Sequence, residues 1–178
     1  MTTSAQAPQA HRSALLVIDL QQAMFKKSAP VYQSERMLAN ILSLAAKARE
    51  AGSPVVWVQH GDARDLVPDT PGWQLHPALA PQEADLKLRK QKSNAFEGTG
   101  LRGMLEQRGV NSAVVCGMVT HGCVKNTCLG ALEEGWQVTL AADAHSSYSK
   151  DAATMIEKWN AALAEAGVSV VESALISF

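Results

Sequence analysis

Hydrophobic residues along the chain gather in short runs, which alternate with longer segments where they recur every three or four positions. The short runs are rich in Val, Leu and Ile, as expected for strands of a parallel sheet that helices cover on both faces. They predict six strands, at residues 14–20, 54–59, 84–90, 112–118, 137–142 and 168–173. Of these, 84–90 alternates polar and apolar residues, so we expect it at a more exposed position in the sheet.

The longer segments have helical periodicity. Apolar residues from Leu38 to Ala48 recur at helical spacing, with Ser34 placed to cap the start of the helix and Gly52 to close its end. The same pattern predicts further helices at 100–108, 122–134 and about 151–166. Each predicted helix therefore lies between two predicted strands.

Strands that alternate with helices are typical of an α/β fold. Because crossovers between parallel strands are right-handed, this order predicts an open, doubly wound, mainly parallel six-stranded sheet with helices on both faces, in a Rossmann-like three-layer arrangement. A chain of 178 residues suits one such domain. We expect the domain at 13–178 and a flexible N-terminal tail at 1–12.

The composition narrows the classes of function. The chain has 47% hydrophobic and 19% charged residues and a formal net charge of -1, which favours a globular protein and argues against one that binds nucleic acid. No stretch reaches the roughly 18 apolar residues of a membrane span, and the N-terminus lacks the apolar core of a signal peptide. We therefore expect a cytoplasmic protein whose partners include neither nucleic acid nor a membrane.

Three chemically distinctive residues lie where predicted strands end or a helix begins. Asp19 follows the apolar run "ALLVI", Lys90 ends the strand at 84–90, and Cys123 begins the helix at 122–134. Because such sheets bind ligands beyond the carboxyl ends of their strands, we expect all three at one edge. They could act as base, cation and nucleophile. The ordinary alternatives are a carboxylate bound to backbone N–H groups, a surface lysine and a buried thiol.

The three cysteines differ in their expected surroundings. Cys123 lies in the first turn of a predicted helix, where unpaired N–H groups and the helix dipole stabilise a thiolate. Cys116 lies inside an apolar strand and Cys128 on an apolar helix face, so we expect both to be buried and unreactive. An odd cysteine count without paired spacing also predicts no disulfide framework. Cys123 is therefore the candidate nucleophile.

Six stretches together resemble the isochorismatase-like cysteine hydrolases, over nearly the whole chain. They read "LLVIDLQ", "VVWVQHGD", "TPGWQLHP", "KQKSNAFEGTGL", "VVCGMVTHGCV" and "VTLAADAHSS". The resemblance implies that the family's catalytic triad of acid, lysine and cysteine falls on Asp19, Lys90 and Cys123. Lys90 is preferred to Lys92 because the "AF" of the fourth stretch sets the register.

The resemblance also implies a mechanism. A cis peptide bond would join Met118 to Val119, and the N–H groups of Val119 and Cys123 would form an oxyanion hole. Asp19 would take the thiol proton, and the thiolate would attack an amide or carbamoyl carbon of a small molecule. Ammonia or an amine would leave, and water would then cleave the thioester. The implied activity is that of an amidohydrolase.

The segment 60–83 carries four prolines and no sustained period, and loops this long are usually functional. We expect the substrate site beside it. The residues expected to contact substrate are Gln21, Phe25, His60, Trp73, Phe96 and His121. The three aromatic residues are expected to form an apolar wall, with core packing as the alternative for each. For His121 the alternative is a position that faces solvent.

The nicotinamidase branch of the family binds a metal through an Asp-x-His pair and a later histidine. Here His60 and Asp62 stand in the reverse order, with His76 downstream. We therefore expect no cofactor or metal, and keep zinc as the alternative. The resemblance also implies a homodimer or homotetramer, for which the Trp-bearing helix at 151–166 is the candidate interface.

Other functions compete with the amidohydrolase. One is a non-catalytic small-molecule-binding or scaffold protein, since a fold does not establish chemistry. An isochorismatase or nicotinamidase activity is another, although true isochorismatases cleave a vinyl ether and lack the nucleophilic cysteine. A dinucleotide-binding oxidoreductase is excluded because "DLQQAMF", rather than a G-x-G-x-x-G turn, follows the first strand. The sequence favours an amidohydrolase outside the nicotinamidase branch and leaves its substrate open.

Overall fold

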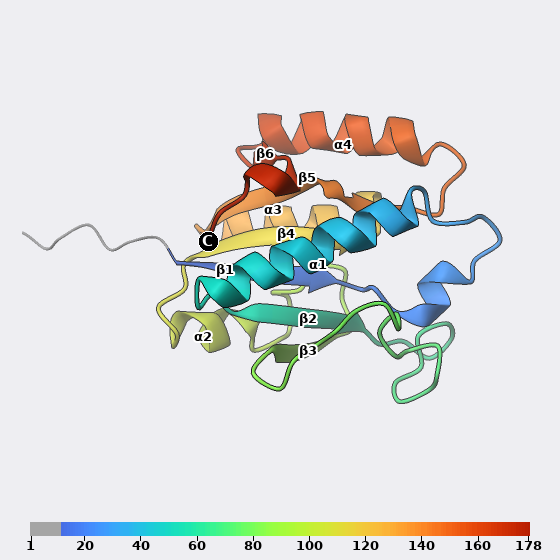
Figure 1. The fold of residues 1–178 in the computed structure, drawn as a ribbon, viewed down its shortest axis with the longest axis horizontal. Helices are drawn as coiled ribbons and strands as arrows, with labels where there is room; N and C mark the ends of the chain where they lie inside the picture. Colours follow the sequence, from blue (N-terminus) through green and yellow to red (C-terminus); the bar gives the residue numbers. More distant parts are fainter. Residues whose placement is uncertain (1–11) are drawn as a thin grey trace, which may run out of the picture.

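The computed structural model describes residues 12–178, which form a six-stranded sheet with helices on both faces (Figure 1). The strands are β1 (Ser13–Ile18), β2 (Val55–His60), β3 (Leu86–Lys90), β4 (Ser112–Met118), β5 (Gln137–Ser146) and β6 (Ser169–Val171). They lie in the order β3-β2-β1-β4-β5-β6, and every adjacent pair is parallel. The predicted fold class is therefore confirmed.

The chain runs outward from β1 in one direction to β2 and β3, and then returns to β4 on the other side of β1. The carboxyl ends of β1 and β4 thus form the switch point of the sheet, where ligands of such folds bind. The predicted tail at 1–12 lies outside the described residues except for Arg12. The guanidinium of Arg12 donates hydrogen bonds to the carbonyls of Gly52 and Arg108.

Helix α1 (Ser34–Glu50) covers one face of the sheet, and α2 (Leu101–Glu106), α3 (Lys125–Glu133) and α4 (Ala152–Glu165) lie on the other (Figure 1). Successive strand residues point to opposite faces. Leu15 of β1 accordingly packs in the core cluster under α1, whereas Leu16 packs in the cluster under α2 and α3. None of the helices within 12–178 is long and apolar enough to cross a membrane.

Several predicted boundaries are corrected. Ser34 is the first residue of α1 rather than its cap, and the cap position is taken by Gln33 with φ of 46° and no side-chain cap hydrogen bond. Strand β1 ends at Ile18 because Asp19 has a left-handed backbone with φ of 49°. The helix predicted at 122–134 is preceded by a π-helical turn at Thr120–Val124, which non-helical angles at Gly122 interrupt, and α3 itself begins at Lys125.

Helix α4 carries the half-buried indole of Trp159. The ammonium groups of Lys125, at the start of α3, and of Lys158 lie 4.7 Å and 5.7 Å from the centre of its ring. Both distances are those of a cation–π contact. The expected subunit interface on this helix stays a prediction.

Gly117 of β4 lies directly against the backbone of β1. Its φ is +116°, and an added Cβ would lie 2.7 Å from the backbone nitrogen of Ile18 and closer still to its carbonyl oxygen. Only glycine tolerates both that conformation and that approach. Gly117 pairs with Ile18, the last residue of β1, which directly precedes Asp19. On its own strand it directly precedes Met118, the last residue of β4.

We therefore expect Gly117→Ala to lower the free energy of unfolding by at least about 3 kcal/mol, because neither backbone can move without breaking the sheet. Urea denaturation measures this. Gly103→Ala is the matched control, because no atom lies within 4 Å of the added Cβ in α2; it should be neutral or stabilise by up to about 1 kcal/mol. Equal stabilities of the two variants would contradict the expectation.

Candidate active site

Asp19 extends the line of β1 into the switch point. Its N–H donates to the carbonyl of Val58 at 2.9 Å, which fixes the backbone in its left-handed conformation. The side chain is buried, and burial raises the pKa of the carboxyl, although the Lys90 ammonium opposes the shift. Oxygen Oδ2 accepts a hydrogen bond from Lys90 at 2.8 Å, while the buried Oδ1 has no hydrogen-bond partner within 12–178. Asp19 is therefore a carboxylate with one unused acceptor and an enhanced affinity for a proton.

Lys90 is the last residue of β3, and its buried side chain crosses to the end of β1. Its ammonium nitrogen Nζ lies 2.8 Å from Oδ2 of Asp19, 3.1 Å from Nδ1 of His60 and 3.2 Å from Sγ of Cys123. A lysine ammonium has three protons to donate, so these three acceptors use all of them. The ion pair with Asp19 is fully enclosed, with 0% and 2% of the two side chains exposed.

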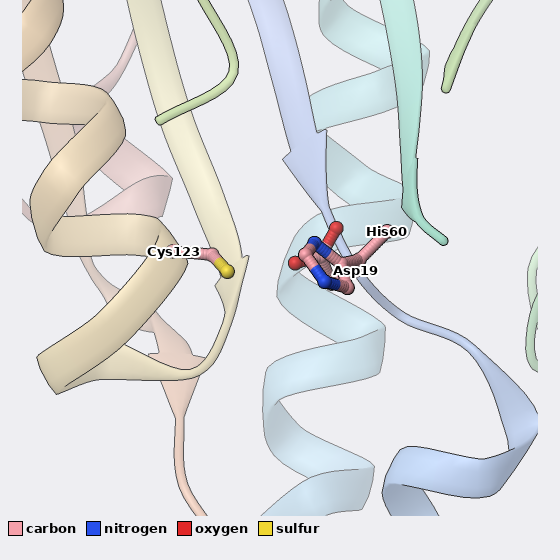
Figure 2. A group of neighbouring side chains, drawn as sticks. All are labelled: Asp19, His60 and Cys123. Atoms are coloured by element: carbon pink, nitrogen blue, oxygen red, sulfur yellow. The ribbon is translucent and has the colours of Figure 1, made fainter. Parts of the chain in front are cut away.

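Cys123 stands on the π-helical turn between β4 and α3. A cis peptide bond joins Met118 to Val119 just before this turn. The Val119 carbonyl then accepts hydrogen bonds from the N–H groups of Gly122 and Val124, which close the turn around Cys123. Figure 2 shows the sulfur of Cys123 pointing toward Asp19 and His60, which come from the ends of β1 and β2. The structure thus brings Asp19, Lys90 and Cys123 together from three separate strand ends.

The surroundings of the thiol act on its ionisation in opposite directions. The pKa of Cys123 is raised to about 12, first by burial and then by the Asp19 carboxylate, although Lys90 lowers it. Burial and the neighbouring anion therefore oppose the thiolate that the start of a helix was expected to stabilise. Cys116 and Cys128 are buried as predicted, and burial raises the pKa of each.

These groups can perform a proton transfer without any other participant. The thiol carries a proton, and Asp19 is near enough to share a hydrogen bond with it and has the raised pKa that a general base requires. Lys90 touches both the donor sulfur and the acceptor carboxylate. The negative charge can therefore move from Asp19 to Cys123 while it remains beside the same cation.

The Lys90 ammonium competes with a metal ion for the ligand atoms at this site. One group of possible ligand atoms exists among residues 12–178, on Asp19, His60 and Cys123, all within 4.8 Å of one another. The Lys90 ammonium contacts each of these three side chains and so occupies the place of a cation. A divalent ion there would have to displace a buried lysine.

The predicted alternative zinc ligands are used elsewhere. Asp62 accepts three backbone N–H groups of its own loop, from Arg64, Asp65 and Leu66. The ring of His76 lies 4.4 Å from that of Phe25, and its Nδ1 accepts the N–H of Ala78. Neither residue therefore belongs to the group of ligand atoms that includes His60.

Two residues predicted to contact substrate hold the backbone of His60. The fully buried amide of Gln21 donates to the carbonyls of His60 and Trp73 at 2.9 Å and 3.0 Å, and its oxygen accepts the N–H of His60 at 2.9 Å. The indole N–H of Trp73 donates to the same His60 carbonyl at 3.0 Å. The polar groups of both side chains are thus hydrogen-bonded within the protein, and substrate contact by Gln21 or Trp73 stays a prediction.

The predicted apolar wall is not formed. Trp73, together with the half-buried Phe25, packs against the core cluster under α1, whereas Phe96 packs under α2 and α3. The ring of Phe96 meets that of Trp136 edge-on, with centroids 5.3 Å apart. His121 is exposed on the turn before Cys123. Substrate contact by Phe25 or His121 stays a prediction.

Sequence reasoning missed a buried polar chain that supports the turn. Thr120 Oγ1 lies 2.9 Å from Nδ1 of His145, and His145 Nε2 lies 2.8 Å from Oδ1 of Asn160. The chain links the turn to β5 and α4. The signal for it was the histidine within the stretch "VTLAADAHSS", an ionisable ring near the end of β5.

A second missed contact fixes the segment after Lys90. The hydroxyl of Thr127 on α3 accepts the N–H of Ala95 at 3.1 Å, and both residues are fully buried. The segment that follows the lysine is thereby attached to the helix that follows the cysteine. Because both ends are fixed, the distance between Lys90 and Cys123 is set by the fold.

Comparisons with known proteins identify a family for this chain. The family model described as the isochorismatase domain matches residues 13–173. Streptothricin hydrolase of Streptomyces noursei is 39% identical over 142 residues, 79% of this chain and 51% of that protein. Maleamate amidohydrolase of Pseudomonas putida is 30% identical over 145 residues, 71% of this chain and 68% of that protein. The chain thus spans about half the length of the first of these two relatives.

A solved structure extends the likeness to the fold. An isochorismatase from Pseudomonas putida KT2440 superposes with a TM-score of 0.83 at 28% identity, over 95% of this chain and 93% of that one.

Proposed function

This chain belongs to the isochorismatase family, whose domain model spans residues 13–173, and we propose that it hydrolyses a C–N bond in a small amide or carbamoyl compound. The observation that carries the proposal is the buried Lys90 ammonium, which is hydrogen-bonded to both the Asp19 carboxylate and the Cys123 sulfur. The printed names of two relatives, a hydrolase of streptothricin and an amidohydrolase of maleamate, support the same class of reaction.

In the first half of the reaction the Asp19 carboxylate takes the proton of Cys123. The sulfur then bonds to the carbonyl carbon of the substrate, and the carbonyl π electrons move onto the oxygen. We assign the N–H groups of Val119 and Cys123 to this oxyanion. When the C–N bond breaks, the nitrogen takes the proton from Asp19 and leaves as ammonia or an amine, so that an acyl or carbamoyl thioester remains.

In the second half Asp19 again acts as the base. It accepts a proton from water as the water oxygen attacks the thioester carbon, and it returns that proton to sulfur when the C–S bond breaks. The products are a carboxylic or carbamic acid and the starting thiol. Lys90 stabilises negative charge on Asp19 and on Cys123 in turn, because its ammonium touches both. We propose no metal for any step, since the ligand atoms already surround that ammonium.

The direct test is ammonia release from a panel of primary amides, nicotinamide, ureido acids, N-carbamoyl amino acids, maleamate and streptothricin. We expect at least one compound to be hydrolysed, and the rate to survive EDTA. The Cys123→Ala variant is the control and should release no ammonia above background. Activity that EDTA removes and added zinc restores would contradict the metal-free mechanism.

The panel also separates the enzyme from a binding protein of the same fold. If no compound is hydrolysed and Cys123 resists alkylation by iodoacetamide as completely as the buried Cys116 and Cys128, the hydrolase proposal fails. Tight binding of a panel compound without turnover would then favour the non-catalytic alternative.

A further inference from the structure

We propose that His60 is a positioning residue that holds the Lys90 ammonium between Asp19 and Cys123. The inference rests on the proposed function, because it assigns His60 to the proton transfer described above. His60 itself touches neither the carbon that would be attacked nor the thiol proton; it acts through Lys90.

The register of the sheet places His60 beside Lys90. The two residues are Cα partners at the ends of the parallel strands β2 and β3, so their side chains leave the sheet on the same face. Nδ1 of His60 lies 3.1 Å from the ammonium nitrogen of Lys90. The other two contacts of that nitrogen are Asp19 Oδ2 and Cys123 Sγ. His60 is therefore the third acceptor of a three-proton donor.

The direction of this hydrogen bond follows from the chemistry. A lysine ammonium has no lone pair, so Nδ1 of His60 must accept, and the ring proton lies on Nε2. The ring also has a hydrogen bond to the backbone of Lys92. Burial, followed by Lys90, lowers the pKa of His60, while Asp19 and Asp62 act in the opposite direction. A neutral imidazole that accepts at Nδ1 is the form this environment favours.

The backbone of His60 is fixed independently of its ring. The Gln21 amide and the Trp73 indole together bind both the N–H and the carbonyl of His60. The peptide at the end of β2 thus has no freedom to drift, and the imidazole presents Nδ1 to Lys90 from a set position. Buried side chains that hydrogen-bond to a single peptide group in this way are typical of residues that orient the reacting groups of a site.

The third acceptor matters because the other two compete. In the resting protein the negative charge is on Asp19, and after proton transfer it is on Cys123. If His60 did not hold the ammonium, Lys90 would close on the carboxylate, lower the pKa of Asp19 and leave the sulfur without a cation. Proton transfer would then be harder. His60 keeps the cation equally available to both ends of the transfer.

The test compares His60→Leu with His60→Asn. The two side chains have similar shapes, but Oδ1 of asparagine can accept a hydrogen bond near the position of Nδ1 and leucine cannot. The rate at which iodoacetamide alkylates Cys123 is followed by mass spectrometry from about pH 4 to about pH 8. Cys116 and Cys128 serve as unreactive internal references, since both are fully buried.

We expect alkylation of His60→Asn to stay within about 3-fold of the wild type, and that of His60→Leu to fall by about 10-fold. The midpoint of the acid limb should also move to lower pH in His60→Leu, because Lys90 then pairs more closely with Asp19. If His60 had a merely structural role, the midpoint of the acid limb would be the same in both variants. His60→Asn would then be alkylated no faster than His60→Leu. If His60→Leu does not fold, His60→Ala fits the same space and carries the same expectation.

Equal rates and equal midpoints in the wild type, His60→Asn and the apolar variant would overturn the inference. Alkylation needs no substrate, so this result is obtained whether or not any amide in the panel is hydrolysed. A panel without turnover therefore counts against the proposed function alone. Where a substrate is found, kcat of the apolar variant should fall while KM stays within about 2-fold.

Discussion

The Cys123→Ser variant will hydrolyse amides at least about 10⁴-fold more slowly than the wild type, measured as kcat for ammonia release. Serine preserves the size and the hydrogen bonds of the side chain but is a far weaker acid and nucleophile than a thiol. The buried base is already asked to ionise a thiol whose pKa is raised to about 12. A serine hydroxyl is a still weaker acid, so we expect the first proton transfer to Asp19 to fail.

The control is a second thiol on the adjacent helix. Cys128→Ala removes a buried sulfur that touches none of the reacting groups, so its kcat should remain within about 3-fold of the wild type. If Cys123→Ser kept more than about 1% of the wild-type rate, the expectation that the reaction depends on a thiol nucleophile would be contradicted.

The Asp19→Asn variant is expected to lose about 10²- to 10⁴-fold in kcat/KM, the usual contribution of a general base. Asparagine keeps the shape of the side chain and can still accept the hydrogen bond of Lys90, but it cannot take a proton. Burial raises the pKa of the Cys123 thiol, so the sulfur needs a neighbouring base to become the nucleophile. Asp19 is the carboxylate that we assign to this task.

The pH dependence of activity is an independent test of Asp19 as the base. Burial raises the pKa of Asp19, and the active form of the base is the carboxylate. Activity should thus be present above that raised pKa and be lost as the pH falls through it, with an acid limb above the ordinary aspartate value of about 3.9. This acid limb should vanish in Asp19→Asn. It should persist in the control variant Asp69→Asn, because the Asp69 carboxylate of the wild type is exposed and forms its ion pair with Arg89. An unchanged limb in Asp19→Asn would assign the base elsewhere.

The strand ends were the predictable part of the site. Asp19, Lys90 and Cys123 lie far apart in the sequence, yet each stands at the end of a strand or the start of a helix, and parallel strands bring such positions to one edge. Hydrophobic periodicity alone was enough to locate that edge. The family resemblance then selected these three residues from the polar groups nearby.

Side-chain direction was the unpredictable part. The hydrogen bonds of Gln21 and Trp73 to the His60 peptide were not predicted, because they depend on how the segments after β1 and after β2 meet, and no sequence pattern encodes that meeting. Phe96 was expected in the same wall as Trp73, yet the two residues pack in opposite core clusters. The raised pKa of Cys123 was missed for a similar reason, since burial and the approach of Asp19 exist only in the folded chain.

All three protons of Lys90 are taken by groups within the protein, so the lysine has nothing left to offer a substrate. Whatever carboxylate, sugar or ring a substrate carries must therefore be recognised by other residues and by backbone groups around the mouth of the site. Selectivity and reactivity are consequently carried by separate sets of atoms. We therefore expect substitutions in the loops around the site to alter substrate specificity while Asp19, Lys90 and Cys123 stay unchanged.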